Sequence, residues 1–254
     1  MVRIGVTGGA GRMGREVIDA VRDRPDGELV FAVNRAPTED AVEGVELEAA
    51  AEFEPLVAER EPDVVIDFTG PRSALAYAES CADAGVAFVT GTTGFDDERL
   101  EELRAAADDA PVLHAPNFAR GVQVLVNVVG EVVRQVPGYD VELIETHHGG
   151  KRDAPSGTAN RLLAEIEANG DFSGRTHGRE GESPRNAGEI GVHAIRAGNV
   201  TGEHEILFAG NDEEIRLTHR AEDRGVFAAG AVDAAVWLAD REAGWYGFDE
   251  VVDA

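Results

Sequence analysis

Short apolar runs alternate with amphipathic segments along the first half of the chain. Apolar runs of about four to eight residues between turn residues predict buried strands, and apolar positions repeated with a helical period predict helices. We expect strands at 3–7, 29–33, 64–68, 86–90 and 111–115, and helices at 15–23, 53–61, 73–84 and 97–107. This alternation is typical of a Rossmann-type, doubly wound parallel sheet with helices on both faces.

The pattern changes in the second half. Helices are expected at 121–134, 158–168 and 227–241, and a strand at 141–148. Residues 169–188 are polar and glycine-rich, which predicts a mobile loop. Strand-like runs at 188–198, 202–210 and 213–221, separated by short turns, predict an antiparallel or mixed sheet. The overall class is therefore α/β, with a second domain of the α+β type.

Acidic residues dominate the charge. The chain has 49 Asp and Glu against 23 Lys and Arg, for a net charge of −26, and the acids are dispersed along it. Such a charge repels nucleic acid, so we expect no nucleic-acid partner. Self-repulsion destabilises a compact chain in dilute buffer and is screened in concentrated salt. The composition therefore indicates a salt-rich cytoplasm, as in halophiles.

Three features favour a cytoplasmic protein that does not enter the membrane. No apolar run reaches the roughly 18–20 residues that span a bilayer, and the N-terminus reads as a strand rather than a secretory leader. The single cysteine, Cys81, excludes an intrachain disulfide and a multi-cysteine zinc site. We expect Cys81 to be a small buried residue on a helix.

A glycine-rich turn follows the first strand and precedes the first helix. Residues 9–14 match G-x-G-x-x-G, and another glycine comes just before them. In this context the backbone amides and the helix start can bind a pyrophosphate, although a plain turn would give the same pattern. The candidate contacts with a dinucleotide are Gly8, Gly9, Ala10, Gly11, Arg12 and Met13.

The ends of the later strands extend this candidate cofactor site. Asn34, at the end of the second strand, can bond a ribose hydroxyl, and Arg35 suits a 2′-phosphate. The pair favours NADPH while leaving NADH open; alternatively, Arg35 is a solvated surface charge. Two further loops lie at carboxyl ends of strands, where they are either ordinary turns or the rim of the crevice for a nicotinamide, and they contain Gly91, Thr92, Thr93, Ala115, Pro116, Asn117 and Phe118.

The stretch HHGGKRDAPSGT, residues 147–158, contains the only lysine of the chain, Lys151. A metal site, a polar loop and a catalytic site are all possible readings. Adjacent side chains at the end of a strand point to opposite faces, and no third ligand is evident, so we expect no metal at His147 and His148. The catalytic reading explains most, because imidazole donates protons near neutrality and an ammonium has donatable protons that guanidinium lacks.

PSGT opens the next helix. Ser156 or Thr158 can cap it, and the amides of Gly157 and Thr158 form a candidate carboxylate site. The remaining histidines carry less information: we expect one in the mobile loop, His177, and the others to be satisfied structural residues in or near strands, namely His114, His193, His204 and His219.

Together these motifs resemble the 4-hydroxy-tetrahydrodipicolinate reductase family, also called dihydrodipicolinate reductase. The resemblance runs from end to end and includes GAGRMG, IDFT, GTTG, APNF, E-x-HH-x-x-K-x-DAPSGT, GEIGVHAIRAG and GEHEILFAG. It implies a dinucleotide-binding domain at 1–117 and 226–254, a substrate-binding and oligomerisation domain at 118–225, and a homotetramer.

The resemblance also implies roles for residues. His147 is similar to the family's proton donor, Lys151 to a second donor, and His148 with Gly157 and Thr158 to the substrate-binding groups. The implied reaction of lysine biosynthesis delivers hydride to ring carbon C4 of a cyclic dicarboxylate and a proton to C3, and the 4-hydroxy form loses water before or during this reduction. The chain departs from many relatives at Asn34, where they carry an acid, and at 149–150, where some carry basic side chains. The alternatives are another two-domain dehydrogenase, such as one for aspartate, and a non-catalytic NADP-sensing protein.

Overall fold

The structure, a computed structural model, describes residues 1–36 and 42–254. They form two compact units, one of residues 1–119 and 224–254 and one of residues 120–223. The boundaries lie two residues from those expected. Phe118 belongs to the first unit because its buried ring packs against Phe68 and Phe248.

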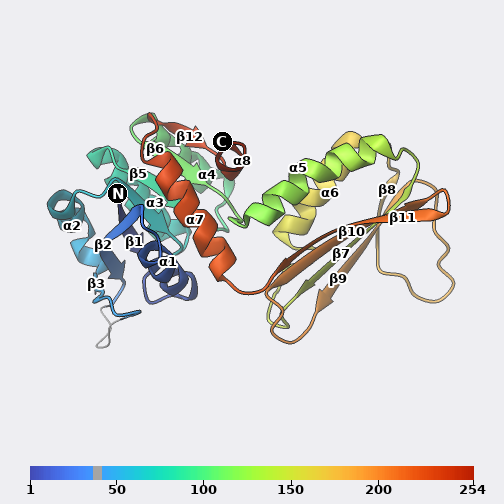
Figure 1. The fold of residues 1–254 in the computed structure, drawn as a ribbon, viewed down its shortest axis with the longest axis horizontal. Helices are drawn as coiled ribbons and strands as arrows, with labels where there is room; N and C mark the ends of the chain where they lie inside the picture. The colour runs from blue at the N-terminus through green and yellow to red at the C-terminus, as the bar shows by residue number, and fades with distance from the viewer. Residues whose placement is uncertain (37–41) are drawn as a thin grey trace. The chain divides into compact units, whose positions relative to one another are not determined.

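The first unit contains a seven-stranded sheet whose strands are all parallel (Figure 1). Its strand order is β12-β6-β5-β4-β1-β2-β3. The strands are β1 Val2–Thr7, β2 Gly27–Asn34, β3 Glu48–Ala49, β4 Val64–Asp67, β5 Ala87–Thr90, β6 Pro111–His114 and β12 Gly244–Tyr246. The order reverses between β1 and β4, the point at which doubly wound sheets bind ligands at the carboxyl ends of their strands.

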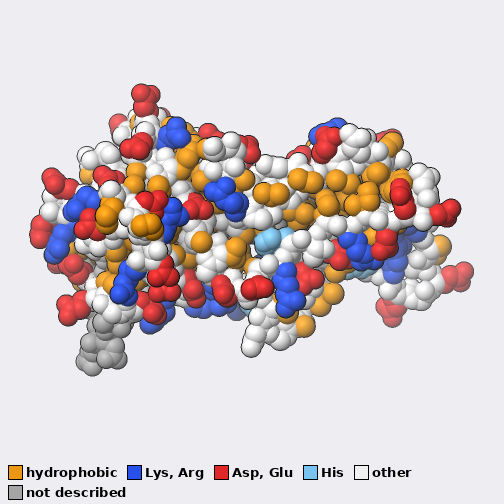
Figure 2. All heavy atoms as spheres, in the orientation of Figure 1, with side chains coloured by type: hydrophobic (Ala, Val, Ile, Leu, Met, Phe, Trp, Pro, Cys, Tyr) orange, Lys and Arg blue, Asp and Glu red, His pale blue; other side chains and the backbone are white. Residues whose placement is uncertain are grey.

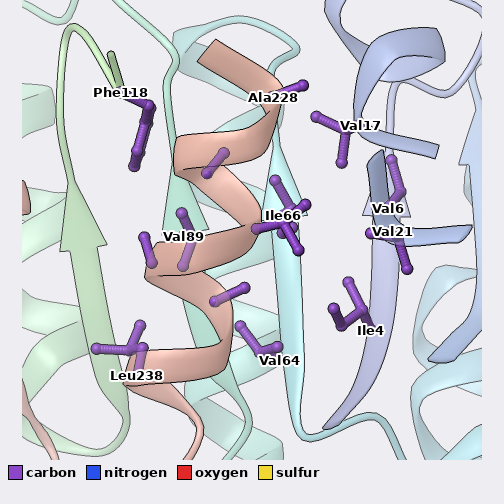
Figure 3. Packing of buried hydrophobic residues seen from close by; sticks show 14 of the residues in the cluster. Ile4, Val6, Val17, Val21, Val64, Ile66, Val89, Phe118, Ala228 and Leu238 are labelled. Atoms are coloured by element: carbon purple, nitrogen blue, oxygen red, sulfur yellow. The ribbon is translucent and has the colours of Figure 1, made fainter. Parts of the chain in front are cut away.

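Helices cover both faces of this sheet. They are α1 Arg12–Arg22, α2 Phe53–Arg60, α3 Pro71–Ala84, α4 Asp97–Ala105, α7 Gly225–Leu238 and α8 Phe248–Val252, with short 3₁₀ turns at Ala50–Glu52 and Ala106–Asp108. The period of two along each strand creates two cores. Ile66 of β4 packs in the core that contains α1 and α7 (Figure 3), whereas the adjacent Val65 packs in the core that contains α2, α3 and α4.

The second unit is a five-stranded mixed sheet in the order β11-β10-β7-β9-β8. The strands are β7 Asp140–His147, β8 Gly174–His177, β9 Glu189–Arg196, β10 Gly202–Gly210 and β11 Glu213–Ala221. β7, β9 and β8 are parallel, and β10 is antiparallel to both β7 and β11. Helices α5 Arg120–Gln135 and α6 Gly157–Asn169 pack on one face, and together they bury a core that includes Val129, Leu143 and Ile206.

The sequence correctly predicts the fold class but misses four short elements. The sequence did not predict strands β3 and β12 or helix α8. The prediction of a continuous loop over 169–188 is wrong, because β8 lies within that segment. β8 is polar and mostly exposed, so it lacks the apolar alternation by which a strand is recognised. The expected buried position of Cys81, on α3, is confirmed.

The surface carries the charge seen in the composition. Figure 2 shows Asp and Glu side chains dispersed over the visible faces of both units rather than gathered in one patch. In the described part of the chain, no helix is both long enough and apolar enough to cross a bilayer.

Candidate active site

The glycine-rich loop between β1 and α1 has the geometry of a dinucleotide cradle. Gly8 has a φ of +68°, which favours glycine, and its carbonyl accepts a hydrogen bond of 2.8 Å from the Gly11 amide. A Cβ at Gly14 would lie 2.2 Å from the Gly8 oxygen, so only glycine allows this close packing of loop and helix. Helix α1 begins at Arg12 and its N-cap residue is Gly11. Within the described residues no side chain accepts a hydrogen bond from the amides of the first turn, so the helix start is suited to an anion.

The candidate residues beside this loop are partly accessible. Ala10 and Met13 are half-buried and Arg12 is exposed. Asn34 ends β2, where its side-chain amide donates to the Ala36 carbonyl at 3.0 Å, and Arg35 is exposed. This position at the end of the second strand is where adenine-ribose contacts occur in such folds.

The two further loops are anchored to their neighbouring strands. The Gly91 amide donates to the Asp67 carbonyl at 2.9 Å, and the Ala115 amide to the Thr90 carbonyl at 3.2 Å. A Cβ at Gly91 would overlap the Phe68 ring at 2.0 Å. These contacts place both loops at the carboxyl edge of the sheet.

The side chains of these loops differ in accessibility. Thr93 and Pro116 are exposed and Asn117 is half-buried, whereas Thr92, Ala115 and Phe118 are buried. The Phe118 ring lies in the core, so of this residue only the backbone is left to face a ligand.

The second constellation lies at the carboxyl end of β7. Val141, Leu143, Glu145 and His147 alternate along the strand and point to the face covered by helices, so the apolar core continues into a buried carboxylate and an imidazole. The Nδ1 of His147 contacts Oε2 of Glu145. A carboxylate only accepts hydrogen bonds, so Nδ1 carries the proton and Nε2 remains for a reacting group.

Neighbouring strands complete this cluster. In the sheet register, Arg196 of β9 is opposite His147 and His204 of β10 is opposite Glu145. Arg196 holds Glu145 with two hydrogen bonds of 2.9 and 2.7 Å, and the His204 ring packs edge-on against His147, with centroids 5.2 Å apart. A Cβ at Gly202 would lie 3.2 Å from the His147 Nε2, so the glycine leaves room at this atom.

The charges of the cluster are set by burial and by these bonds. Burial lowers the pKa of His147 despite the opposing effect of Glu145. Burial acts to raise the pKa of Glu145, but the bonds from Arg196 and His147 outweigh it and the pKa is lowered. Burial, with a contribution from His147, lowers the pKa of His204 to about 3. The cluster therefore contains an ionised carboxylate between a guanidinium and an imidazole.

Lys151 and His148 follow β7 in the next turn. The Lys151 amide donates to the His148 carbonyl at 3.1 Å, and both side chains are half-buried. The Lys151 ammonium pairs with Asp153 at 2.9 Å, and its charge contributes to lowering the pKa of His147. Lys151 is thus near the imidazole, and its charge is partly neutralised by Asp153.

The start of α6 lies against the same carboxylate. Ser156 is the N-cap: its Oγ accepts from the Ala159 amide at 3.1 Å, and its own amide donates to Glu145 at 3.1 Å. Gly157 is exposed and Thr158 is half-buried in the first turn. Glu145 therefore connects the imidazole, Arg196 and the start of α6.

Three members of this cluster were missed or misjudged from the sequence. Glu145 could have been found from its spacing of two from His147, which places both on one face. Arg196 has no local signal, because only the register of β9 brings it to Glu145. The expectation that His204 is a satisfied structural residue is wrong: it lies against His147 and shares a 3.1 Å hydrogen bond with Ser156, and its buried Nδ1 has no partner in the described residues.

The other histidines lie apart from the cluster. His114 bonds the Thr92 carbonyl through Nε2 at 3.1 Å, and His193 bonds Glu142 at 2.7 Å. The buried Nδ1 of His219 has no partner in the described residues, so the expectation of satisfied bonding is wrong there too. Within residues 1–36 and 42–254, no three His, Cys, Asp or Glu side chains are grouped to hold a metal.

The fold and these two constellations define a class, the NAD(P)-dependent oxidoreductases with a separate second domain. The family profile described as dihydrodipicolinate reductase N-terminus matches residues 2–118, and the corresponding C-terminus profile matches residues 121–252. The chain belongs to the dihydrodipicolinate reductase family.

Individual relatives agree along the whole chain. A 4-hydroxy-tetrahydrodipicolinate reductase of Haloarcula marismortui is 50% identical over 254 residues and covers 100% of both chains. One of Natronomonas pharaonis is 52% identical over 248 residues, covering 97% of this chain and 98% of its own. The solved structure of a dipicolinate-bound dihydrodipicolinate reductase from Paenisporosarcina matches with a TM-score of 0.79, 28% identity and 97% coverage of both chains.

Proposed function

We propose that the chain reduces 4-hydroxy-tetrahydrodipicolinate, with His147 as the proton donor, Lys151 as the residue that binds and polarises the substrate, and NADPH favoured over NADH. The reductase activity in lysine biosynthesis and the use of a nicotinamide cofactor follow from membership of the family. The residue roles and the cofactor preference rest on the geometry. The observation that carries the residue roles is the Glu145–His147 contact with the only lysine of the chain beside it, and the cofactor preference rests on Arg35.

The bonding of His147 supports a proton donor. Glu145 holds Nδ1, and Gly202 leaves room at Nε2, so a single ring nitrogen is available to a carbon centre. A buried imidazole that is oriented by a carboxylate can be protonated and can donate in the transition state. In the proposed reaction, the 4-hydroxyl group of the substrate leaves as water, Nε2 gives its proton to ring carbon C3, and the Glu145 carboxylate stabilises the imidazolium beforehand. A bound nicotinamide supplies the hydride.

The substrate carries two carboxylates, and the chain offers cationic and helix-terminal groups for them. Lys151 exchanges its partner Asp153 for a substrate carboxylate and supports negative charge that develops on the ring. The first turn of α6, at Gly157 and Thr158, binds a carboxylate through the helix start. His148 is the additional substrate-binding group.

The loop between β1 and α1 is proposed to bind the pyrophosphate of the cofactor, with Arg12 and Met13 at the helix start. NADPH is favoured because the exposed Arg35 can form paired hydrogen bonds with a 2′-phosphate. Thr93 and Asn117 are the most accessible polar side chains of the loops assigned to the nicotinamide half. Thr92 and Phe118 support these loops from within the unit.

A homotetramer in the cytoplasm, without nucleic-acid or membrane partners, is also part of the proposal. For the homotetramer, the relevant surface is the sheet face of the second unit that helices leave open, which includes Ile195 with an exposure of 45%.

Replacement of Lys151 tests the proposed function. We expect Lys151→Ala to lower kcat/KM at least about a hundredfold, because proton and charge stabilisation of this kind contributes about 10²–10⁴ in rate. Lys151→Arg should fail as well, since a guanidinium keeps the charge but neither the compact shape nor the donatable proton. The measurement is the substrate-dependent loss of reduced-nicotinamide absorbance, followed with NADPH and with NADH.

Arg220→Ala is a matched control, because Arg220 is an exposed basic residue of β11 with a side-chain exposure of 69%. It should turn over like the unmodified protein. Normal turnover by a folded Lys151→Ala protein would refute the assignment of Lys151.

A further inference from the structure

Asp67, at the end of β4, is a fully buried carboxylate that is held by hydroxyl groups. Four threonines reach it, two from strands β1 and β5 and two from the loops that follow β4 and β5. Oδ1 accepts from Thr7 at 2.7 Å and from Thr69 at 2.6 Å, and Oδ2 accepts from Thr90 at 2.9 Å and from Thr92 at 2.7 Å. No arginine, lysine or histidine is among these partners.

This arrangement fixes the direction of the hydroxyl protons. A carboxylate only accepts hydrogen bonds, and each hydroxyl has a single proton. All four threonine hydroxyls therefore donate their protons to Asp67, and each oxygen can act towards any other group only as an acceptor. Thr90 shows the consequence within the protein, because its Oγ1 accepts a hydrogen bond of 3.1 Å from the Thr92 amide.

Thr69 differs from the other three in its exposure. Thr7, Thr90 and Thr92 are buried, whereas Thr69 is exposed. It follows β4 at the point where the strand order reverses, and its methyl group lies against the glycine-rich loop: a Cβ at Gly8 would be 2.9 Å from it. In doubly wound sheets the dinucleotide crosses at this point, with its nicotinamide half over the strands that continue from β4.

We infer that Thr69 Oγ1 is an obligate acceptor for the carboxamide NH₂ of the nicotinamide, and that Asp67 is the positioning residue that makes it so. The inference rests on the proposed use of a nicotinamide cofactor. It adds a binding preference that a pocket without this acceptor would lack. A cofactor with a hydrogen-bond donor at the carboxamide nitrogen should bind more tightly than one of the same shape without the donor.

The test compares NADH with its 3-acetylpyridine analogue, in which a methyl group replaces the NH₂. Binding is measured by calorimetry without substrate. We expect the unmodified protein to bind NADH about fivefold more tightly, which corresponds to about 1 kcal/mol, the net contribution of one hydrogen bond. Thr69→Val should lose this preference by weakening NADH alone, and Thr69→Ser should retain it.

Asp67→Asn provides the second variant. With its amide nitrogen in the Oδ1 position, it donates to Thr7 and Thr69, the Thr69 hydroxyl can turn its proton outward, and the preference for NADH should also fall. Thr218→Val, at an exposed threonine of β11, is the control and should keep the preference. If Asp67→Asn does not fold, Thr69→Val and Thr69→Ser still decide the question.

The outcomes separate this inference from the proposed function. Equal weakening of both cofactors in Thr69→Val, or of neither, would overturn the inference even when the reductase is active. If the preference follows the expected pattern but the unmodified protein does not reduce 4-hydroxy-tetrahydrodipicolinate, the proposed function fails and the role of Thr69 stands.

Discussion

Asp67 and Glu145 are both fully buried carboxylates near the carboxyl ends of strands, yet their partners differ in kind. Asp67 accepts from neutral hydroxyls that carry no charge at any ordinary pH. Glu145 accepts from a guanidinium, an imidazole and a backbone amide. The hydroxyl shell makes a fixed framework for loops, whereas the cationic shell includes a group that can gain and lose a proton. The partners of a buried carboxylate, more than its burial, determine whether it supports binding or chemistry.

The sharpest test of this comparison is Glu145→Gln. The amide keeps the shape but weakens the hold on the His147 proton, so we expect kcat to fall about a hundredfold, within the range for general acid catalysis. Glu145 also acts to raise the pKa of His147. Without Glu145 the pKa of His147 falls, so His147 loses its proton at lower pH. The alkaline limb of the kcat/KM profile should therefore shift to lower pH. Affinity for NADH should not change.

Glu142→Gln is the matched control for this variant. Glu142 lies on the same strand, points to the other face, and is also held by basic side chains, including Arg185 and His193. Its replacement should leave the pH profile in place. An equal shift of the profile in both variants would show that Glu145 acts through the stability of the sheet.

Arg35→Ser tests whether Arg35 is the residue of the first unit that recognises the 2′-phosphate of NADPH. We expect the KM for NADPH to rise about tenfold, or about 1.4 kcal/mol, because a paired hydrogen bond to phosphate is removed. The KM for NADH should stay constant. Arg60→Ser, at an exposed arginine of α2, is the control, and an equal change for both cofactors would contradict the role of Arg35.

His204, which lies in the Glu145 cluster, should make the free energy of unfolding depend on pH, whereas the Asp67 site contains no such group. Its pKa is about 3 in the folded protein against an ordinary 6.5, so the unfolded chain binds the proton first as the pH falls. The stabilisation is complete above about 6.5 and is lost towards pH 3, at about 1 kcal/mol per pH unit. In His204→Gln, denaturant unfolding should depend less on pH in this window. The exposed His177→Gln is the control, and an unchanged slope in His204→Gln would contradict the prediction.

Salt should affect the whole molecule rather than either site. Screening of a net charge of −26 is expected to add about 1 kcal/mol of stability between dilute and molar KCl and so to raise Tm by about 2–4 °C for a chain of this size. Choline chloride at equal ionic strength should act in the same way. An unchanged Tm would contradict the inference, drawn from the acidic composition, that the protein works in a salt-rich cytoplasm.

Much of the fold could be predicted because its strongest elements have clear periods. β4 and β5 are uninterrupted buried runs, β1 is buried over its last four residues, and α1 and α5 have distinct apolar faces. The short β12 has only three residues and pairs at the edge of the sheet, so its position depends on β6 rather than on a pattern of its own.

The candidate site divides in the same way. His147 and Lys151 are neighbours along the chain and are visible in one motif. Arg196 and His204 reach Glu145 through strand register, and the threonines reach Asp67 from separate strand ends. Contacts of this kind are set by the packing of distant segments, which local sequence does not specify.

The interrupted first unit has a consequence for synthesis on the ribosome. Helix α7 covers the sheet residues Val64, Ile66 and Val89, but it follows the whole second unit in the chain (Figure 3). The nascent chain therefore emerges with the part of the sheet that α7 covers still exposed beside α1 until residues 225–238 have left the exit tunnel, while residues 120–223 can already complete their own core. The apolar strands made first are the last to be sealed, and that interval is when newly made chains are most exposed to aggregation.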